Sequence, residues 1–227
     1  MIDEPDAVAP ADASQSRVHT LEDNIARYLD ITAAVLLSIA TVATAWCVYQ
    51  ANGWGGEQTR AYAEAASHRI ESTRAYNRSM QVLAIDADLF MQWVAAYNAG
   101  DQRLLTFYET NLMRPEFLPH LSDWRASRPL ENPDAEPNPL VGEEYQRQLF
   151  AESEQLRSEA EAEFEDASDA NQTGDEYVLS TVSFASVLFF AGISPKFYSS
   201  RIQMGLVGMA ILMFMVGVFQ IGGLPVH

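Results

Sequence analysis

Three long apolar blocks interrupt an otherwise polar chain of 227 residues. Residues 31–49, 177–194 and 202–223 contain no charged side chain. A bilayer core about 30 Å thick is crossed by about 20 helical residues, so each block is long enough to span a membrane. The pattern therefore predicts an all-α membrane protein with three transmembrane helices.

The first block has two alternative interpretations, a cleaved signal peptide and a lipid-attachment site at Cys47. It follows a long acidic segment, and its apolar run exceeds a usual signal-peptide core. Trp46 also occupies the position where a lipid-attachment site needs a small residue. We favour a membrane-spanning anchor.

Beyond the first block, apolar and small residues recur from Tyr62 to Tyr97 with gaps that alternate between three and four. This spacing is typical of one face of a helix. Three glycines within residues 52–56 predict a break before this helix, and Ala99-Gly100 predicts its end.

A second, thinner and strongly acidic stripe runs from Tyr145 to Ala167. Residues 101–127 read as one or two shorter helices, and four prolines make 128–142 an extended loop. Residues 53–176 are therefore predicted to form an acidic helical hairpin domain with a proline-rich tip. Since a lone pair of helices buries little, we expect aromatic residues of the tip region to fill a small core there.

The remaining boundaries follow from the same pattern. They are a disordered acidic tail over 1–20, an amphipathic lead-in and first transmembrane helix over 21–52, a short basic loop over 195–201, and a tail over 224–227.

The net charge of −17 is concentrated outside the blocks. Residues 53–176 hold 24 acidic residues and ten arginines, so this domain should not bind nucleic acid. Lys196 and Arg201 lie in the short loop, and Arg17 and Arg27 lie before the first block. The positive-inside rule then predicts a cytoplasmic N-terminus and an external 53–176 domain. Thirteen arginines against one lysine suggest a prokaryotic source, and hence a multi-pass protein of the inner membrane.

Aromatic side chains flank the blocks at the positions expected for membrane-interface anchors. They are Tyr28, Trp46, Tyr49, Trp54, Tyr177 and Tyr198.

Within the blocks, small and hydroxyl side chains recur at helical spacing. Ser38, Thr41 and Thr44 form one arc, and Ser180, Ser183 and Ser186 form another. Such arcs can line a polar pore or hold helices together, and we favour helix packing. Gly205 and Gly208 give the third block a close-packing surface of the same kind.

The residues suited to chemistry are few. Glu64, His68 and Glu71 share one helical face and could bind a metal, although a polar face paired with arginines is the simpler interpretation. Asp86 and Asp88 are two positions apart, so they point to different sides of a helix and cannot act as a catalytic pair. No nucleophile motif, phosphate loop or cofactor motif is present. We therefore expect no catalytic, cofactor-binding or metal-binding residues.

Three segments carry a resemblance to a known group: Ala-Trp-Cys-Val-Tyr-Gln-Ala-Asn-Gly-Trp-Gly-Gly-Glu-Gln at 45–58, Glu-Ser-Thr-Arg-Ala at 71–75, and Phe-Ala-Gly-Ile-Ser at 190–194. Together they resemble a group of uncharacterised prokaryotic membrane proteins with three spans. The resemblance covers roughly residues 30–202 and implies one span, a helical domain and two further spans. It implies no activity, cofactor or site residue.

These observations predict a non-enzymatic membrane scaffold or accessory subunit. Its helical hairpin would self-associate or dock on a membrane complex, so the expected partners are the lipid bilayer and either further copies of the chain or other subunits. The alternative is a small oligomeric channel lined by the hydroxyl arcs of the first two spans. A truncated sensor is a third possibility, but no output domain follows the spans.

Overall fold

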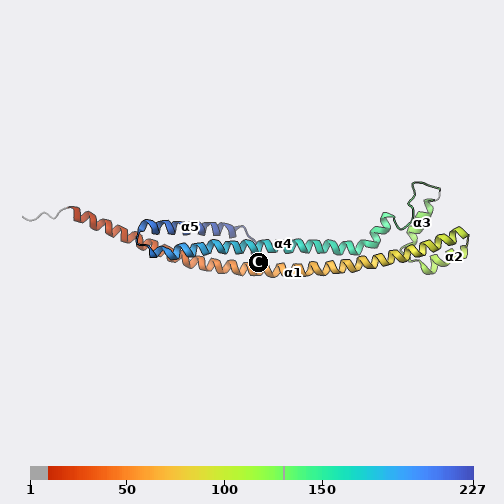
Figure 1. The fold of residues 1–227 in the computed structure, drawn as a ribbon, viewed down its shortest axis with the longest axis horizontal. Coiled ribbons are helices and arrows are strands. Elements are labelled where there is room, and N and C mark those ends of the chain that lie inside the picture. Colours follow the sequence, from red (N-terminus) through yellow and green to blue (C-terminus); the bar gives the residue numbers. More distant parts are fainter. Residues whose placement is uncertain (1–9, 130) are drawn as a thin grey trace, which may run out of the picture. The chain divides into compact units, whose positions relative to one another are not determined.

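The computed structural model describes the backbone of residues 10–129 and 131–227, and side chains from Asn24 onward (Figure 1). All regular structure in these residues is helical, and no strand occurs among them. The elements are α1 (Pro10–Ala99), α2 (Gln102–Phe107), the π-helical turn η1 (Tyr108–Leu112), α3 (Leu118–Ala126), α4 (Glu143–Ile193), the 3-10 turn η2 (Ser194–Lys196) and α5 (Ser200–Gly222).

Helices α1, α4 and α5 each contain a stretch that is long and apolar enough to cross a membrane. The prediction of three membrane-spanning helices is confirmed in length and composition, as expected of a multi-pass membrane protein.

Two predicted helix boundaries are wrong. Helix α1 continues without a break through residues 52–56, although three of these are glycines. A glycine inside a helix costs only about 0.5–1 kcal/mol relative to alanine, which apolar packing on both sides outweighs. Helix α4 likewise continues beyond Ala167, the end of the predicted acidic stripe, into its apolar stretch without a break.

The predicted disordered tail also needs correction. Helix α1 already begins at Pro10, a residue suited to the first turn of a helix because it lacks a backbone N–H. Residues 1–9 of the predicted tail lie outside the described residues.

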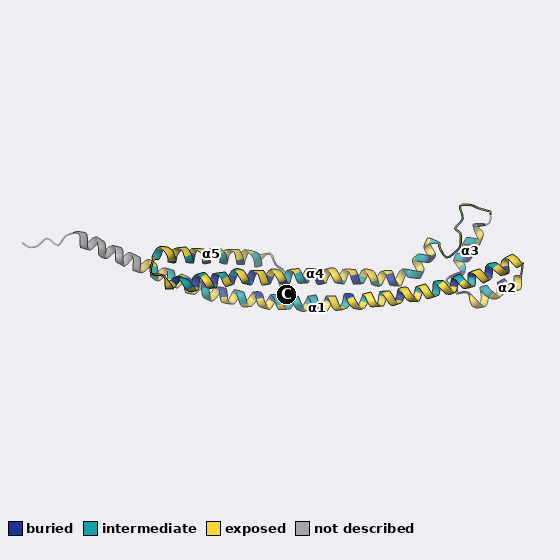
Figure 2. Cartoon of the chain, viewed as in Figure 1, coloured by how far each residue is buried: buried dark blue, intermediate teal, exposed yellow. Residues whose placement is uncertain are grey.

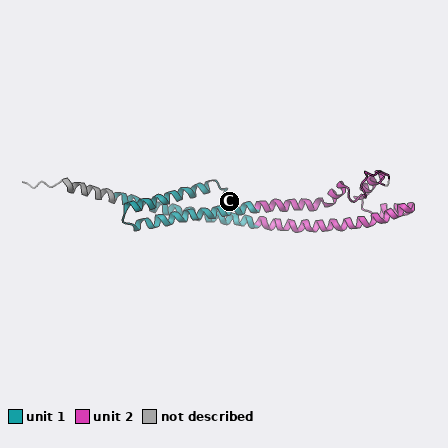
Figure 3. Cartoon of the chain, turned by 45° about the horizontal axis from the view of Figure 1, so that its top comes forward, with its two compact units in different colours: residues 1–59, 167–227 teal, residues 60–166 magenta. Residues whose placement is uncertain are grey.

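The helices divide into two compact units, which Figure 3 colours separately. Unit 1 comprises residues 1–59 and 167–227, and unit 2 comprises residues 60–166. Each unit is described by itself below.

Unit 1 packs the apolar stretches of α1, α4 and α5 around a core of small residues on α1. Ala33, Leu36, Ala40 and Cys47 are buried there at gaps of three, four and seven, which places them on one helix face. They pack in one cluster with buried residues of the other two helices, namely Phe184, Val187, Ala191, Val207 and Ala210.

Polar contacts mark the two ends of unit 1. At one end, the Gln203 amide donates to the carboxylate of Asp30 over 2.9 Å. At the other end, Trp54 Nε1 and the Tyr177 hydroxyl both donate to the Pro225 carbonyl, each over 3.2 Å. The start of the α1 span and the start of α5 are therefore at one end. The end of the α1 span, the start of the α4 span and residues 224–227 are at the other.

Unit 2 holds a second core where α1 ends. Its largest buried side chains are Trp93 and Phe117. Gly100, with φ at +73°, ends α1 in the left-handed conformation that glycine adopts without strain, as the sequence predicted. Helices α2 and α3 and the turn η1 lie within residues 101–127, and the described residues of 128–142 form the predicted loop. Figure 2 shows that the buried residues of α1 and α4 form narrow stripes along these helices.

Candidate functional site

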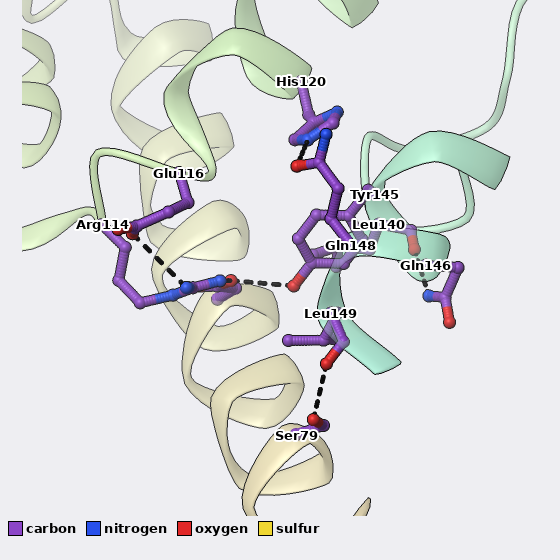
Figure 4. A network of polar contacts seen from close by, with 10 residues as sticks. Ser79, Arg114, Glu116, His120, Leu140, Tyr145, Gln146, Gln148 and Leu149 are labelled. Atoms are coloured by element: carbon purple, nitrogen blue, oxygen red, sulfur yellow. Dashed lines mark hydrogen bonds and ion pairs between the residues drawn. The ribbon is translucent and has the colours of Figure 1, made fainter. Parts of the chain in front are cut away.

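The most deeply buried charged group in the described chain belongs to unit 2. The Asp86 side chain is 1% exposed. Arg114, in the connection between η1 and α3, donates to it from Nε over 3.2 Å and from a terminal nitrogen over 2.6 Å. The Tyr145 hydroxyl, near the start of α4, donates to the same carboxylate over 2.8 Å. Three separate segments therefore converge on one carboxylate, as Figure 4 shows for the Arg114 and Tyr145 side chains.

The electrostatics of this cluster suit a fixed structural role. The hydrogen bond to Asp86 raises the pKa of Arg114, which keeps its guanidinium charged. Burial, followed by the hydrogen bond to Asp86, raises the pKa of Tyr145 and keeps its hydroxyl protonated. A proton-transfer site would need a group that titrates near neutral pH, whereas both shifts move away from it.

The acidic pair at 86 and 88 lies as predicted. Asp86 is buried, whereas Asp88 is exposed and accepts a hydrogen bond from the Gln92 side chain over 2.8 Å. The two carboxylates thus belong to different surroundings and do not form a catalytic pair.

The helical face of Glu64, His68 and Glu71, for which metal binding was the less favoured interpretation, carries an ion pair. Glu64 pairs with Arg60 one turn earlier on α1. Nδ1 of His68 is buried without a hydrogen-bond partner. Among the side chains from Asn24 onward, excluding position 130, no three His, Cys, Asp or Glu residues come together in a way that could hold a metal ion.

The six predicted interface anchors fall into two sets. Tyr28, Trp46, Tyr49 and Tyr198 are exposed in unit 1, where lipid or headgroups can reach them. Tyr177 is 1% exposed and Trp54 is half-buried, and both donate to the Pro225 carbonyl. The latter two side chains therefore bind residues 224–227 to α1 and α4.

The hydroxyl arc of the first span does not face the other helices of unit 1. Ser38 and Thr41 are exposed, and each donates to the carbonyl four residues earlier, as does the half-buried Thr44. Since each hydroxyl donates within its own helix, this arc contributes no hydrogen bond to α4 or α5.

The second arc is mixed. Ser180 is buried and Ser186 is half-buried, and both donate to carbonyls of their own helix. Ser183 makes the one interhelical bond of the arc, donating to Oε1 of Gln220 on α5 over 2.9 Å. The two arcs are not brought together into one lining.

The glycine contact in α5 lies at a different residue from those predicted. A Cβ added to Gly205 or Gly208 would meet no atom within 4 Å. A Cβ on Gly217 would lie 2.9 Å from the buried ring of Phe184. Gly217 therefore allows the close approach of α4 and α5, while the other two glycines are exposed.

Unit 2 carries two aromatic pairs at its surface, in which Tyr62, Tyr76 and Phe164 are exposed and Phe150 is half-buried. Tyr62 on α1 lies 5.5 Å from Phe164 on α4, and Tyr76 lies 5.3 Å from Phe150, between ring centroids. Both steps, 62 to 76 and 164 to 150, are fourteen residues long, or two heptads. The pairs therefore recur on the same side of each helix. We call this the aromatic stripe.

Sequence reasoning named Tyr145 only as part of the acidic stripe and did not name Arg114, because their partner Asp86 lies far away along the chain and a single sequence gives no signal for such pairing. It missed Trp93 as well, although this residue lies three positions after Phe90 on the predicted helical stripe. Its burial and its hydrogen bond to Glu109, over 3.0 Å, place it at the centre of the unit 2 core.

Comparison with protein families, with curated proteins and with solved structures finds no match for this chain.

Proposed function

We propose that the chain is a non-enzymatic membrane scaffold whose unit 2 is a helical hairpin that associates with a second copy. The observation that carries the proposal is the aromatic stripe. Tyr76 and Phe164 are each 48% exposed, and Met80 on α1 adds a further exposed apolar side chain. Large apolar side chains in a repeated pattern outside an apolar span favour an interaction surface.

Heptad spacing favours a helical partner. Side chains that recur every seven residues present one seam along a helix, and a second helical pair can insert its own side chains into that seam. Two such pairs would form a four-helix bundle, which buries more apolar surface than one pair. A second copy supplies the same spacing without any further component.

Charge is compatible with this pairing along the stripe itself. On α1, Ala66 and Thr73 between the two aromatic positions carry no charge, whereas Arg69 lies midway between those positions. On α4, Arg157 lies midway between Phe150 and Phe164, and it contacts Glu154 over 3.1 Å and Glu161 over 3.7 Å. The two glutamates thus compensate the charge of Arg157 on α4, although the domain as a whole is acidic.

Size-exclusion chromatography with light scattering, on the full chain in detergent, tests the proposal. We expect a dimer, or a larger even-numbered oligomer, that a Tyr62→Ser/Tyr76→Ser double variant shifts to monomer. Ile85→Ser is the matched control. Ile85 is exposed and lies nine positions after Tyr76, on the opposite side of the helix. Its replacement should therefore leave the oligomer intact.

Crosslinking gives an independent test. In a Cys47→Ala background, Tyr76→Cys should form a crosslinked dimer with a short bismaleimide, whereas Ile85→Cys should not. A wild-type chain that stays monomeric at every concentration, together with no crosslink at position 76, would contradict the proposal.

A further inference from the structure

Unit 2 contains a cavity of about 210 Å³ beside the end of α1 and the end of α3. Trp93 and Tyr97 of α1 form one wall, and Trp124 of α3 forms another. Arg125 and Arg128 lie at its rim together with Glu131. The lining thus combines aromatic faces with two guanidinium groups.

The aromatic wall is rigid. The Trp93 and Tyr97 rings stack with centroids 5.3 Å apart and an interplanar angle of 16°. Trp93 is held by its hydrogen bond to Glu109, and Trp124 by a hydrogen bond from its indole to the Glu136 carbonyl over 2.8 Å. Fixed ring faces bind a flat apolar body with little loss of side-chain entropy.

Both arginines keep donors available. Arg125 lies 3.7 Å from Glu109, and Arg128 lies 3.8 Å from Glu131. These separations exceed ordinary hydrogen-bond lengths, so neither contact is a tight pair. Guanidinium groups with open donors bind carboxylates, often with two parallel hydrogen bonds.

The backbone at Arg128 gives a further indication. Its φ is +50°, in the left-handed region that a bulky residue adopts at a cost, and it is the one non-glycine residue with positive φ in the described chain. Glycine would adopt this turn without strain. Strained backbone that the fold maintains is often found at binding sites.

We propose that this cavity binds a small aromatic carboxylate, with the ring against Tyr97 and Trp124 and the carboxylate on Arg125 and Arg128. The volume lies below the roughly 300–1,000 Å³ of drug-sized sites, so the ligand carries a single ring system. The site is separate from the aromatic stripe, and it stands whether or not the chain dimerises.

The test is isothermal titration of the full chain in nanodiscs with three probes that share one ring. Phenylacetate carries a negative charge, phenylacetamide is neutral, and phenethylammonium carries a positive charge. We expect phenylacetate to bind in the sub-millimolar range and at least tenfold more tightly than the other two. Tighter binding of phenethylammonium, or no binding of any probe, overturns the proposal.

Variants locate the binding. An Arg125→Gln/Arg128→Gln double variant should weaken phenylacetate at least tenfold, whereas Arg147→Gln, an exposed arginine on α4, should not change it. Arg128→Gly relieves the positive φ, so it should melt at the wild-type temperature or higher while losing affinity. Unchanged affinity in the double variant would place the probe elsewhere and overturn the site.

Discussion

Asp86 of α1 accepts two hydrogen bonds from the guanidinium of Arg114, twenty-eight residues further along the chain. A carboxylate that is 1% exposed would be costly to bury without such partners. Since Tyr145 donates to the same group, the start of α4, the η1–α3 connection and α1 are fixed to one point. This cluster sets how the chain turns within unit 2.

Replacing Arg114 with methionine should destabilise unit 2 by about 2–4 kcal/mol. The usual penalty for removing one partner of a buried pair is about 3–5 kcal/mol, reduced here because the Arg114 side chain is 33% exposed. Denaturation of the full chain in detergent, followed by tryptophan fluorescence, measures the change.

The control for that experiment is Arg147→Met, which removes an exposed ion pair with Glu144 and should cost less than about 1 kcal/mol. An Asp86→Leu/Arg114→Met double variant removes both charges and should recover much of the loss, since no uncompensated carboxylate remains. A double variant as unstable as Arg114→Met alone would argue against this account.

The helices of the fold could be predicted from the sequence because hydrophobic periodicity is a local property. The three apolar blocks, the end of α1 at Gly100 and the proline-rich loop follow from neighbouring residues. The glycines at 53–56 wrongly predicted a helix break, because the helix-breaking tendency of glycine is weak compared with tertiary packing. Residues such as Arg114 and Asp86 meet only in the folded chain, so no local sequence pattern predicts their contact.

The Tyr145 hydroxyl predicts a specific loss of stability in alkali. Its pKa is raised by burial and by Asp86, so only the unfolded state releases this proton at the ordinary tyrosine pKa of about 10. The stabilisation is complete below that pH and is lost as the pH rises toward the folded pKa. The free energy of unfolding of Tyr145→Phe should therefore decline less than that of the wild type between about pH 8 and about pH 11. Equal declines in the denaturation midpoints of Tyr145→Phe and the wild type over this pH range would contradict the prediction.

Replacement by alanine should destabilise the chain at Gly217 of α5 but not at Gly208. At Gly217 the added Cβ would lie 2.9 Å from Phe184, and overpacking of this kind typically costs about 1–3 kcal/mol. At Gly208 the Cβ meets nothing within 4 Å, so the isolated chain should unfold as the wild type does. Thermal unfolding in detergent compares the two. Equal melting temperatures for both variants would show that α4 and α5 do not approach closely at Gly217.

For the residues expected inside the membrane, the sequence did not predict which helix face packs against the other helices. Spacing correctly grouped Ser38, Thr41 and Thr44 on one arc, but it could not say which arc faces the neighbouring helices. The buried face of α1 consists instead of small apolar residues such as Ala33 and Ala40. In a span, alanine and serine allow equally close helix approach, so composition alone does not distinguish the two faces.

The glycines that failed to break α1 offer the last test. A Cβ on Gly55 or Gly56 meets no atom within 4 Å, so a Gly55→Ala/Gly56→Ala variant should stabilise the helix by about 0.5–1 kcal/mol per residue. Gly53→Ala is the contrasting control, since its Cβ would lie 2.8 Å from the ring of His227. It should release residues 224–227, detectable as faster carboxypeptidase digestion. A Gly55→Ala/Gly56→Ala variant that unfolds more readily would mean that α1 bends at these residues, because only a non-helical backbone there would be strained by the added methyl groups.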